Sequence, residues 1–285
     1  MFFNKIISSA AVVDTAKKAA ENSSDPSWIM HHVLDANSIN FGPLGTLNLP
    51  HIQLFGIDIS ITRDIFIIWV VSVILILLSI FAARGYRKSL IPKGLSNVFE
   101  IIIEFVRDEI VKPSIGKGYE SYLPFMLTLF FFVLFCNLFG LIPAPNLIVP
   151  TGNIAVTAAL AGISFIAIQY SGIKSYGFIK YFKNLVPPGM PGWIVVVIIP
   201  LELLGLFTKP FALCVRLFAN MIAGHIVIFS LVGLIFIMHT VYVAPVSVGF
   251  TLFIELLELL VALIQAYIFT MLTALFIGMA KHMEH

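Results

Sequence analysis

The sequence predicts an all-α membrane protein that crosses the bilayer several times. Hydrophobic residues make up 59% of the 285 residues and charged residues only 11%, whereas about a quarter of the residues of a soluble domain are charged. The mean hydropathy is +1.01, and several apolar runs are long enough to cross a bilayer core of about 30 Å as helices. The composition therefore excludes a soluble globular protein.

Motifs typical of cofactor, metal or nucleic-acid binding are missing. Cys136 and Cys214 lie far apart in apolar runs, so we expect buried thiols rather than a disulfide or a metal site. The pair His31-His32 is the nearest approach to a metal motif, but adjacent residues do not share a helix face. The sequence contains no Gly-rich phosphate loop, serine elbow or concentrated basic patch. We expect no cofactor, no metal, no catalytic site and no nucleic-acid partner.

Residues 1–60 are mixed in character, and we expect them to form an N-terminal extracytoplasmic segment ahead of a membrane domain over 61–285. Whether residues 1–24 persist in the mature protein is left open. Residues 28–34 predict a small interfacial helix. The Gly- and Pro-containing tract over 40–61 favours short strands or extended loop at the membrane surface.

Residues 64–83 form the first predicted span, because they contain no internal charge. Basic residues at 84–93 follow at once and place the exit of this span on the inner side of the membrane. Residues 95–111 carry charged residues at helical spacing between apolar ones. This pattern is typical of an amphipathic helix lying on the inner surface rather than of a span.

Two shorter spans are expected over 122–141 and 154–170, and Asn137 is the polar residue inside the first. The linker between them is uncharged, as expected outside, and lysines after residue 170 mark the inner side again. Lys281 places the C-terminus inside, so the N-terminus is predicted to lie outside.

The two remaining apolar stretches, 193–238 and 246–280, are too long for upright spans. As helices they would reach about 69 Å and about 52 Å, against a bilayer core of about 30 Å. We therefore expect two steeply tilted helices that pack as a hairpin, turning near residues 242–245. Their ionisable groups are expected to be buried between protein surfaces.

Ionisable residues inside this hairpin are the main functional signal, because a charge placed in lipid costs roughly 3 kcal/mol on insertion scales. Glu202, Lys209 and Arg216 are seven residues apart, so they share one helix face if the helix continues through Pro210. Arg216 has a structural alternative, as the ion-pair partner of Glu202 or of Glu258. Lys209 and Glu255 are assigned no role.

His225 lies about half a turn away from Arg216 and can take up a proton near neutral pH. On its own it would be interpreted as a core histidine. With Glu258 on the partner helix as its acceptor, a proton relay is favoured. Asn220 is either an interhelical hydrogen-bond residue or part of a water path, and Gln265 is either packing or part of the same polar site.

These residues resemble the signatures of subunit a of the F-type ATP synthase. The matching segments are Lys209-Pro210, Arg216-Leu217-Phe218-Ala219-Asn220-Met221, Ala223-Gly224-His225 and residues 263–269. The resemblance covers nearly the whole chain and implies that Arg216 is the arginine facing a rotor ring. It implies that Glu202, Asn220, Gln265 and Asn137 occupy polar channel positions. Histidine at 225 with glutamate at 258 matches one of the two arrangements in that family.

The resemblance implies a stationary proton channel of the Fo motor, in which Arg216 separates two offset half-paths and the chain has no catalytic site of its own. The implied partners are a ring of small proteolipid subunits (subunit c), the peripheral-stalk subunit b, the remaining ATP synthase subunits and membrane lipid. The implied location is an energy-transducing membrane, with the bacterial inner membrane preferred to the mitochondrial one. Proton or sodium specificity and the size of the ring are left open.

An alternative function is an ion-coupled secondary transporter or channel whose Arg216 binds an anionic substrate. This hypothesis predicts a substrate cavity at mid-membrane within this chain alone. A copurifying proteolipid ring would distinguish the two functions.

Overall fold

The computed structural model describes residues 38–40, 46–48, 53–54, 57–58, 62–88, 94–142, 150–183, 192–238 and 241–282. The expectations for residues 1–24 and 28–34 lie outside these ranges. Short strands are present in the Gly- and Pro-containing tract, as its composition predicts. They form two antiparallel pairs, β1 (Ser38–Asn40) with β2 (Thr46–Asn48) and β3 (Gln53–Leu54) with β4 (Ile57–Asp58).

Helical segments make up most of the described chain after residue 62. Their order is α4 (Arg63–Lys88), α5 (Leu95–Phe105), the π-helix η3 (Val106–Val111), α6 (Lys112–Ile115), the 3-10 turn η4 (Tyr119–Ser121), α7 (Leu123–Gly140), the 3-10 turn η5 (Pro150–Gly152), α8 (Ile154–Tyr176), α9 (Phe178–Lys183), α10 (Gly192–Met238), the 3-10 turn η6 (Val241–Val243) and α11 (Ala244–Lys281). Among the described residues, α4, α7, α8, α10 and α11 are long and apolar enough to cross a membrane. The predicted all-α, multi-span architecture is confirmed.

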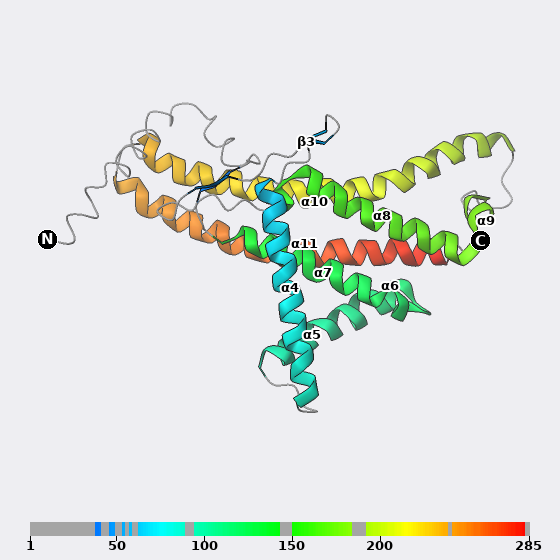
Figure 1. The fold of residues 1–285 in the computed structure, drawn as a ribbon. Coiled ribbons are helices and arrows are strands. Elements are labelled where there is room, and N and C mark those ends of the chain that lie inside the picture. Colours follow the sequence, from blue (N-terminus) through cyan, green and yellow to red (C-terminus); the bar gives the residue numbers. More distant parts are fainter. Residues whose placement is uncertain are drawn as a thin grey trace.

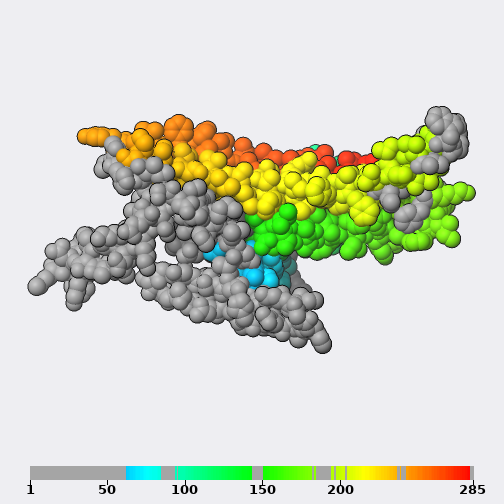
Figure 2. All heavy atoms as spheres, turned by 90° about the horizontal axis from the view of Figure 1, so that it is seen from above, coloured from blue at the N-terminus to red at the C-terminus, as the bar shows by residue number. Residues whose placement is uncertain are grey.

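Helices α10 and α11 run beside each other as a long hairpin, in yellow and orange to red in Figures 1 and 2. Helix α10 continues through both Pro200 and Pro210, which is the condition for Glu202, Lys209 and Arg216 to share a face. The turn is η6, after which Pro245 lies in the first turn of α11, where its missing N–H is not needed. Near this turn the Ser247 hydroxyl donates to the carbonyl of Leu231 and ties α11 back to α10.

Helices α7 and α8 lie along the hairpin, while α4 crosses it (Figure 1). Helix α4 packs on α7 through Ile67, Val71 and Cys136, which are almost fully buried. The outward side of α4 is apolar and exposed, with Trp69 at 57% and Phe81 at 62%. This side is suited to lipid or to a membrane partner.

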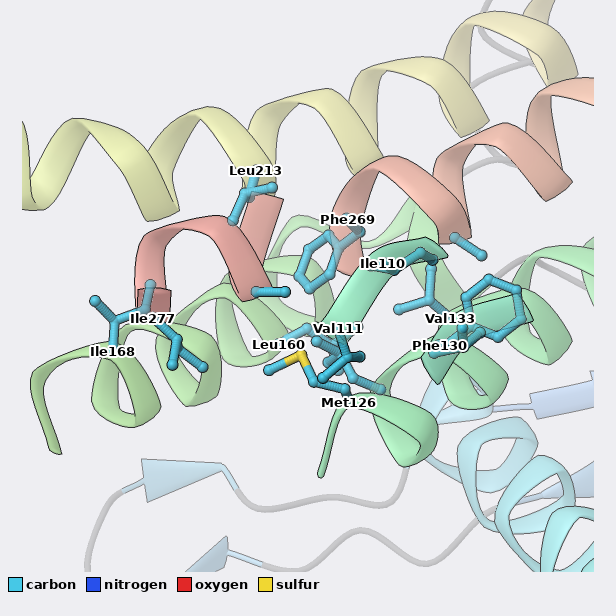
Figure 3. Close-up of a cluster of buried hydrophobic side chains, with 14 of the residues drawn as sticks. Ile110, Val111, Met126, Phe130, Val133, Leu160, Ile168, Leu213, Phe269 and Ile277 are labelled. Carbon is cyan, nitrogen blue, oxygen red and sulfur yellow. The ribbon is translucent and has the colours of Figure 1, made fainter. Parts of the chain in front are cut away.

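The main core lies where α7, α8, α10 and α11 meet the π-helix η3 (Figure 3). One buried side chain from each of these five elements is Val133, Leu160, Leu213, Phe269 and Ile110. The surface segment and the tilted hairpin therefore share one core. Helix α11 therefore packs against η3 as well as against α10.

The amphipathic segment that begins at Leu95 divides into an α-helical and a π-helical part. Val106, Ile110 and Val111 are all fully buried. In an α-helix Ile110 and Val111 would point about 100° apart, so the wider π-helical turn helps both to reach the core. Such a local widening leaves no signature in a pattern of apolar residues, and the sequence predicted one continuous helix here.

Charged residues cover the solvent side of the same segment. Arg107 donates to both carboxylate oxygens of Asp108, at 3.1 Å from Nε and 2.7 Å from Nη2, and it also lies 3.5 Å from Glu104. This hydrogen bond lowers the pKa of Asp108 and raises that of Arg107. Arg107 is half-buried and Asp108 is exposed, so the solvent-accessible pair contributes little to stability, but it marks the polar face of an amphipathic helix.

The C-terminal end of α11 is fixed to α6 and to the turn that follows it. His282 Nε2 lies 3.0 Å from the carbonyl oxygen of Ile115, and the Lys281 ammonium donates to the carbonyl of Lys117. Gly278 touches the backbone of Ser114 so closely that a Cβ there would overlap the Ser114 carbonyl oxygen. Here glycine is required because two backbones meet.

Candidate functional site

Arg216 lies on the exposed face of α10. Among the described residues its guanidinium has no ion pair and no hydrogen bond. The structural alternative, a pair with Glu202 or Glu258, is therefore not realised within the described chain. The surrounding surface is apolar: Phe211 is 67% exposed and Val215 is 37% exposed.

Small residues surround Arg216 on this face. Ala212, Ala219 and Ala223 are all exposed and lie four residues before, three residues after and seven residues after Arg216. These spacings place them on the same side of the helix. Small side chains let another helix approach the backbone closely. The guanidinium therefore extends from a helix face whose neighbouring side chains are short.

The ionisable groups were expected to be buried between protein surfaces, but within this chain Glu202 and Arg216 are exposed rather than covered by α11. The packing stripe of α10 consists of Leu213, Leu217 and Met221, each at most 5% exposed. Arg216 precedes Leu217 by one residue and is therefore turned by about 100° from that stripe. The stripe of charged residues and the stripe that packs are different faces of one helix.

Lys209 differs from the two other members of its stripe. It is half-buried, and its ammonium lies 5.2 Å from the centre of the Phe276 ring on α11. This is a cation–π contact between the two long helices. It gives Lys209 a structural partner, which Arg216 lacks within the described part of the chain.

Two predicted site residues meet between the long helices. The amide of Asn220 on α10 donates from Nδ2 to Oε1 of Gln265 on α11, at 2.9 Å. Gln265 is only 2% exposed. Asn220 follows Arg216 by four residues, so this hydrogen bond fixes the α10–α11 contact next to the guanidinium.

Asn137 connects α7 to α11, the helix that carries Gln265. It is fully buried, its Oδ1 accepts from the Thr151 hydroxyl at 2.8 Å, and its Nδ2 lies 3.5 Å from the carbonyl oxygen of Ala262. Ala262 is four residues, or one helical turn, from Glu258 on α11. The structure thus brings Asn137 near the Glu258 region, and it adds Thr151, which the sequence did not single out.

His225 and Glu258 do not form the direct hydrogen bond that the sequence suggested. Among the described residues, His225 Nε2 and both carboxylate oxygens of Glu258 are buried and have no hydrogen-bond partner. The His225 ring lies instead near the Phe229 ring, tilted by 32° with centroids 6.2 Å apart. A buried polar atom without a partner costs about 1–3 kcal/mol, so these atoms are suited to exchange hydrogen bonds with water or with a transferred proton.

Gly224 is a site residue that sequence reasoning missed. The Glu258 side chain packs against it, and a Cβ built on Gly224 would lie 2.6 Å from Glu258 Cδ and would overlap Oε1. Glycine inside a helix costs about 1 kcal/mol relative to alanine, so its place beside His225 in the middle of α10 was the available signal. Its lack of a side chain makes the space for the carboxylate.

The comparisons with known proteins cover this whole site. A family model described as ATP synthase A chain matches residues 65–278. The chain is 50% identical over 261 residues to ATP synthase subunit a of Chloroherpeton thalassium, which covers 90% of this chain and 77% of that relative. It is 46% identical over 274 residues to ATP synthase subunit a 2 of Chlorobaculum tepidum, covering 95% and 76%. It is also 46% identical over 231 residues to ATP synthase subunit a of Myxococcus xanthus, covering 80% and 75%.

Proposed function

Because this chain belongs to the ATP synthase A chain family, we propose that it is the stationary proton-conducting subunit of an ATP synthase membrane motor. In this proposal Arg216 separates an outer half-path from an inner one, and the chain passes protons to and from a carboxylate on a ring of small proteolipid subunits. The site residues are those that the sequence singled out: Arg216, His225, Glu258, Asn220, Gln265, Glu202 and Asn137.

The observation that carries the proposal is the exposed guanidinium of Arg216 on an apolar face. Facing lipid, this charge would be costly. Facing a carboxylate on an apolar ring, it would be compensated, and the alanines around it would let the ring helix come close. The alternative of an anion transporter requires a substrate cavity within this chain, whereas Arg216 lies on the outer face of the hairpin.

The half-paths follow from where polar groups lie on the two helices. The outer path uses His225, Glu258 and Asn137. Buried atoms of His225 and Glu258 have no hydrogen-bond partner among the described residues, and Asn137 connects α7 to α11. The inner path uses Glu202, which is exposed and two heptads before Arg216 on the same face of α10. A proton enters by the first path, neutralises a ring carboxylate, and leaves by the second after the ring has turned.

Arg216 keeps the two paths apart by charge. A guanidinium stays protonated at any working pH, so it cannot carry a proton across by itself. It stabilises the ionised form of the ring carboxylate that passes it, and it repels a hydronium that would otherwise leak directly between the paths. Each proton that moves through 100 mV supplies about 2.3 kcal/mol to rotation.

The proposal includes the surroundings of the subunit. It works in a complex with the other ATP synthase subunits, including the ring and the peripheral-stalk subunit b. The named relatives come from bacteria, which favours the bacterial plasma membrane as the energy-transducing membrane. Residues 1–60 would be extracytoplasmic, 61–285 would be the membrane domain, and the C-terminus would be inside.

A photo-cross-linking experiment tests the proposed contact with the ring. A photoreactive amino acid at Ala219, next to Arg216 on the open face, is expected to link this chain to a small apolar subunit of the purified complex. The same probe at Trp69, on the exposed side of α4, serves as the control and is expected to give no link to that subunit. If Ala219 links only to lipid, the arginine face does not meet a ring.

The space that Gly224 provides for Glu258 gives a second prediction. Gly224→Ala is expected to displace the carboxylate and to lower ATP-driven proton pumping on the order of a hundredfold, at the lower end of general acid–base effects. Gly205→Ala is the matched control, because it lies on the same helix and its Cβ would meet nothing within 4 Å. Pumping is measured by fluorescence quenching in inverted vesicles. Equal rates for the two variants would contradict a role for the Glu258 position.

A further inference from the structure

A buried carboxylate outside the site described above lies at the start of α4. Asp64 is 1% exposed, and its neighbour Arg63 is 4% exposed. Asn153 donates from Nδ2 to Oδ2 of Asp64 at 2.7 Å. The same Asn153 caps α8, because its Oδ1 accepts from the backbone N–H of Ala155 at 2.9 Å. One amide therefore holds both the start of α8 and the orientation of the carboxylate.

The polar contacts continue from this point toward the proton site. Thr151, two residues before Asn153, is fully buried and donates to Asn137, whose amide reaches the Ala262 carbonyl on α11. Glu258 lies one turn away on that helix. The short turn η5 with the cap of α8 thus has one hydrogen bond to α4 and another that leads to α11.

We propose that Asp64 is a further proton-collecting carboxylate of the outer half-path, positioned by Asn153 and leading toward Glu258 past Thr151 and Asn137. The inference rests on the proposed function. A proton from the outer solution binds a carboxylate oxygen of Asp64 and neutralises it. The proton then leaves to ordered water, Asp64 becomes a carboxylate again, and Glu258 accepts the proton.

Each side chain has a distinct part in this path. The amides and the hydroxyl do not change charge, but they supply the donors and acceptors that hold water in a buried site. Asp64 is the member that can bind and release a proton. Arg63 remains charged beside it and favours the return of Asp64 to the ionised form. A purely structural role for Asp64 would need only an oxygen that accepts from Asn153.

That difference makes Asp64→Asn the deciding variant. Asparagine keeps an accepting oxygen and nearly the same shape but cannot take up a proton. The intact ATP synthase is reconstituted in liposomes with the outer face of this chain toward the lumen, and ATP synthesis is measured at a fixed potassium-diffusion potential while lumenal pH is varied. Glu120→Gln, which removes an exposed carboxylate, is the control for charge loss.

We expect Asp64→Asn to match the wild-type rate at acidic lumenal pH, where protons are abundant, and to fall on the order of a hundredfold below it near neutral pH. Asp64→Glu is expected to restore the rate near neutral pH. Wild-type rates at every pH, or one constant factor of loss at all pH values, would overturn the proposal.

Asn153→Ser provides a second test of the proposal in case Asp64→Asn does not fold. Serine still caps a helix well but releases Asp64, so the same pH-dependent loss with a smaller amplitude is expected, and a pH-independent loss counts against the proposal. If Asp64→Asn behaves like the wild type while Arg216→Ala abolishes pumping, only the role of Asp64 is overturned and the proposed function stands. Normal pumping by Arg216→Ala would instead remove the proposed function itself.

Discussion

Replacing Arg216 with alanine is expected to abolish ATP-driven proton pumping in inverted membrane vesicles. The substitution removes the single fixed charge that we place between the half-paths, so a proton can pass from one path to the other without turning the ring. The ring carboxylate also loses the cation that stabilises its ionised form. ATP hydrolysis then proceeds without net transport, and passive proton permeability persists or rises.

Two variants accompany this experiment. Arg216→Lys retains a positive charge, but a lysine can lose its proton when it is desolvated, so pumping is expected to fall well below the wild-type rate. Lys209→Ala removes a cation from the same stripe whose ammonium lies over the Phe276 ring of α11, and pumping is expected to persist. Near-wild-type pumping by Arg216→Ala would show that Arg216 does not separate the two half-paths.

The sequence predicted the hairpin because its determinants are local. The lengths of the two apolar stretches exclude upright spans, and the polar residues at spacings of seven identify shared faces. The structure confirms that α10 continues through Pro210 and that the turn lies just before Ala244. In a membrane, a helix tolerates such a proline because its neighbours re-satisfy the freed carbonyl groups.

The sequence could not identify which shared face packs. Periodicity places Glu202 and Arg216 on one side of α10, but the buried stripe of Leu213, Leu217 and Met221 decides which side meets α11. All of these positions lie in an almost continuously apolar stretch. In the proposed function a separate chain covers this polar face, and the sequence of this chain holds no record of that partner.

Contacts between residues far apart in the sequence were likewise beyond periodicity. The Thr151–Asn137 and Asn153–Asp64 hydrogen bonds join segments separated by 14 and 89 residues. Asn220 and Gln265 were each singled out for their polarity, and the structure shows them hydrogen-bonded to each other. Polar residues in an apolar run could be recognised as candidates, but their partners depend on how the helices assemble.

Replacing Gly278 with alanine is expected to prevent stable accumulation of the subunit in the membrane. The added Cβ would overlap the carbonyl oxygen of Ser114 and lie 3.0 Å from its carbonyl carbon. Both are backbone atoms of a segment packed against the core, so no side-chain rotation relieves the overlap. Overpacking costs about 1–3 kcal/mol where neighbours can shift, and more where they cannot.

The matched control is Gly249→Ala on the same helix, where a Cβ would meet nothing within 4 Å. Alanine is the better helix former by about 1 kcal/mol, so this variant is expected to accumulate normally. The amount of this chain in washed membranes and of assembled complex on native gels measures both effects. If Gly278→Ala assembled and pumped like Gly249→Ala, the close contact of α11 with Ser114 would not be needed to hold the hairpin. Because Arg216 and Glu258 reach their positions through that hairpin, a loss confined to Gly278→Ala would instead indicate that the proton site depends on a backbone contact at the far end of α11.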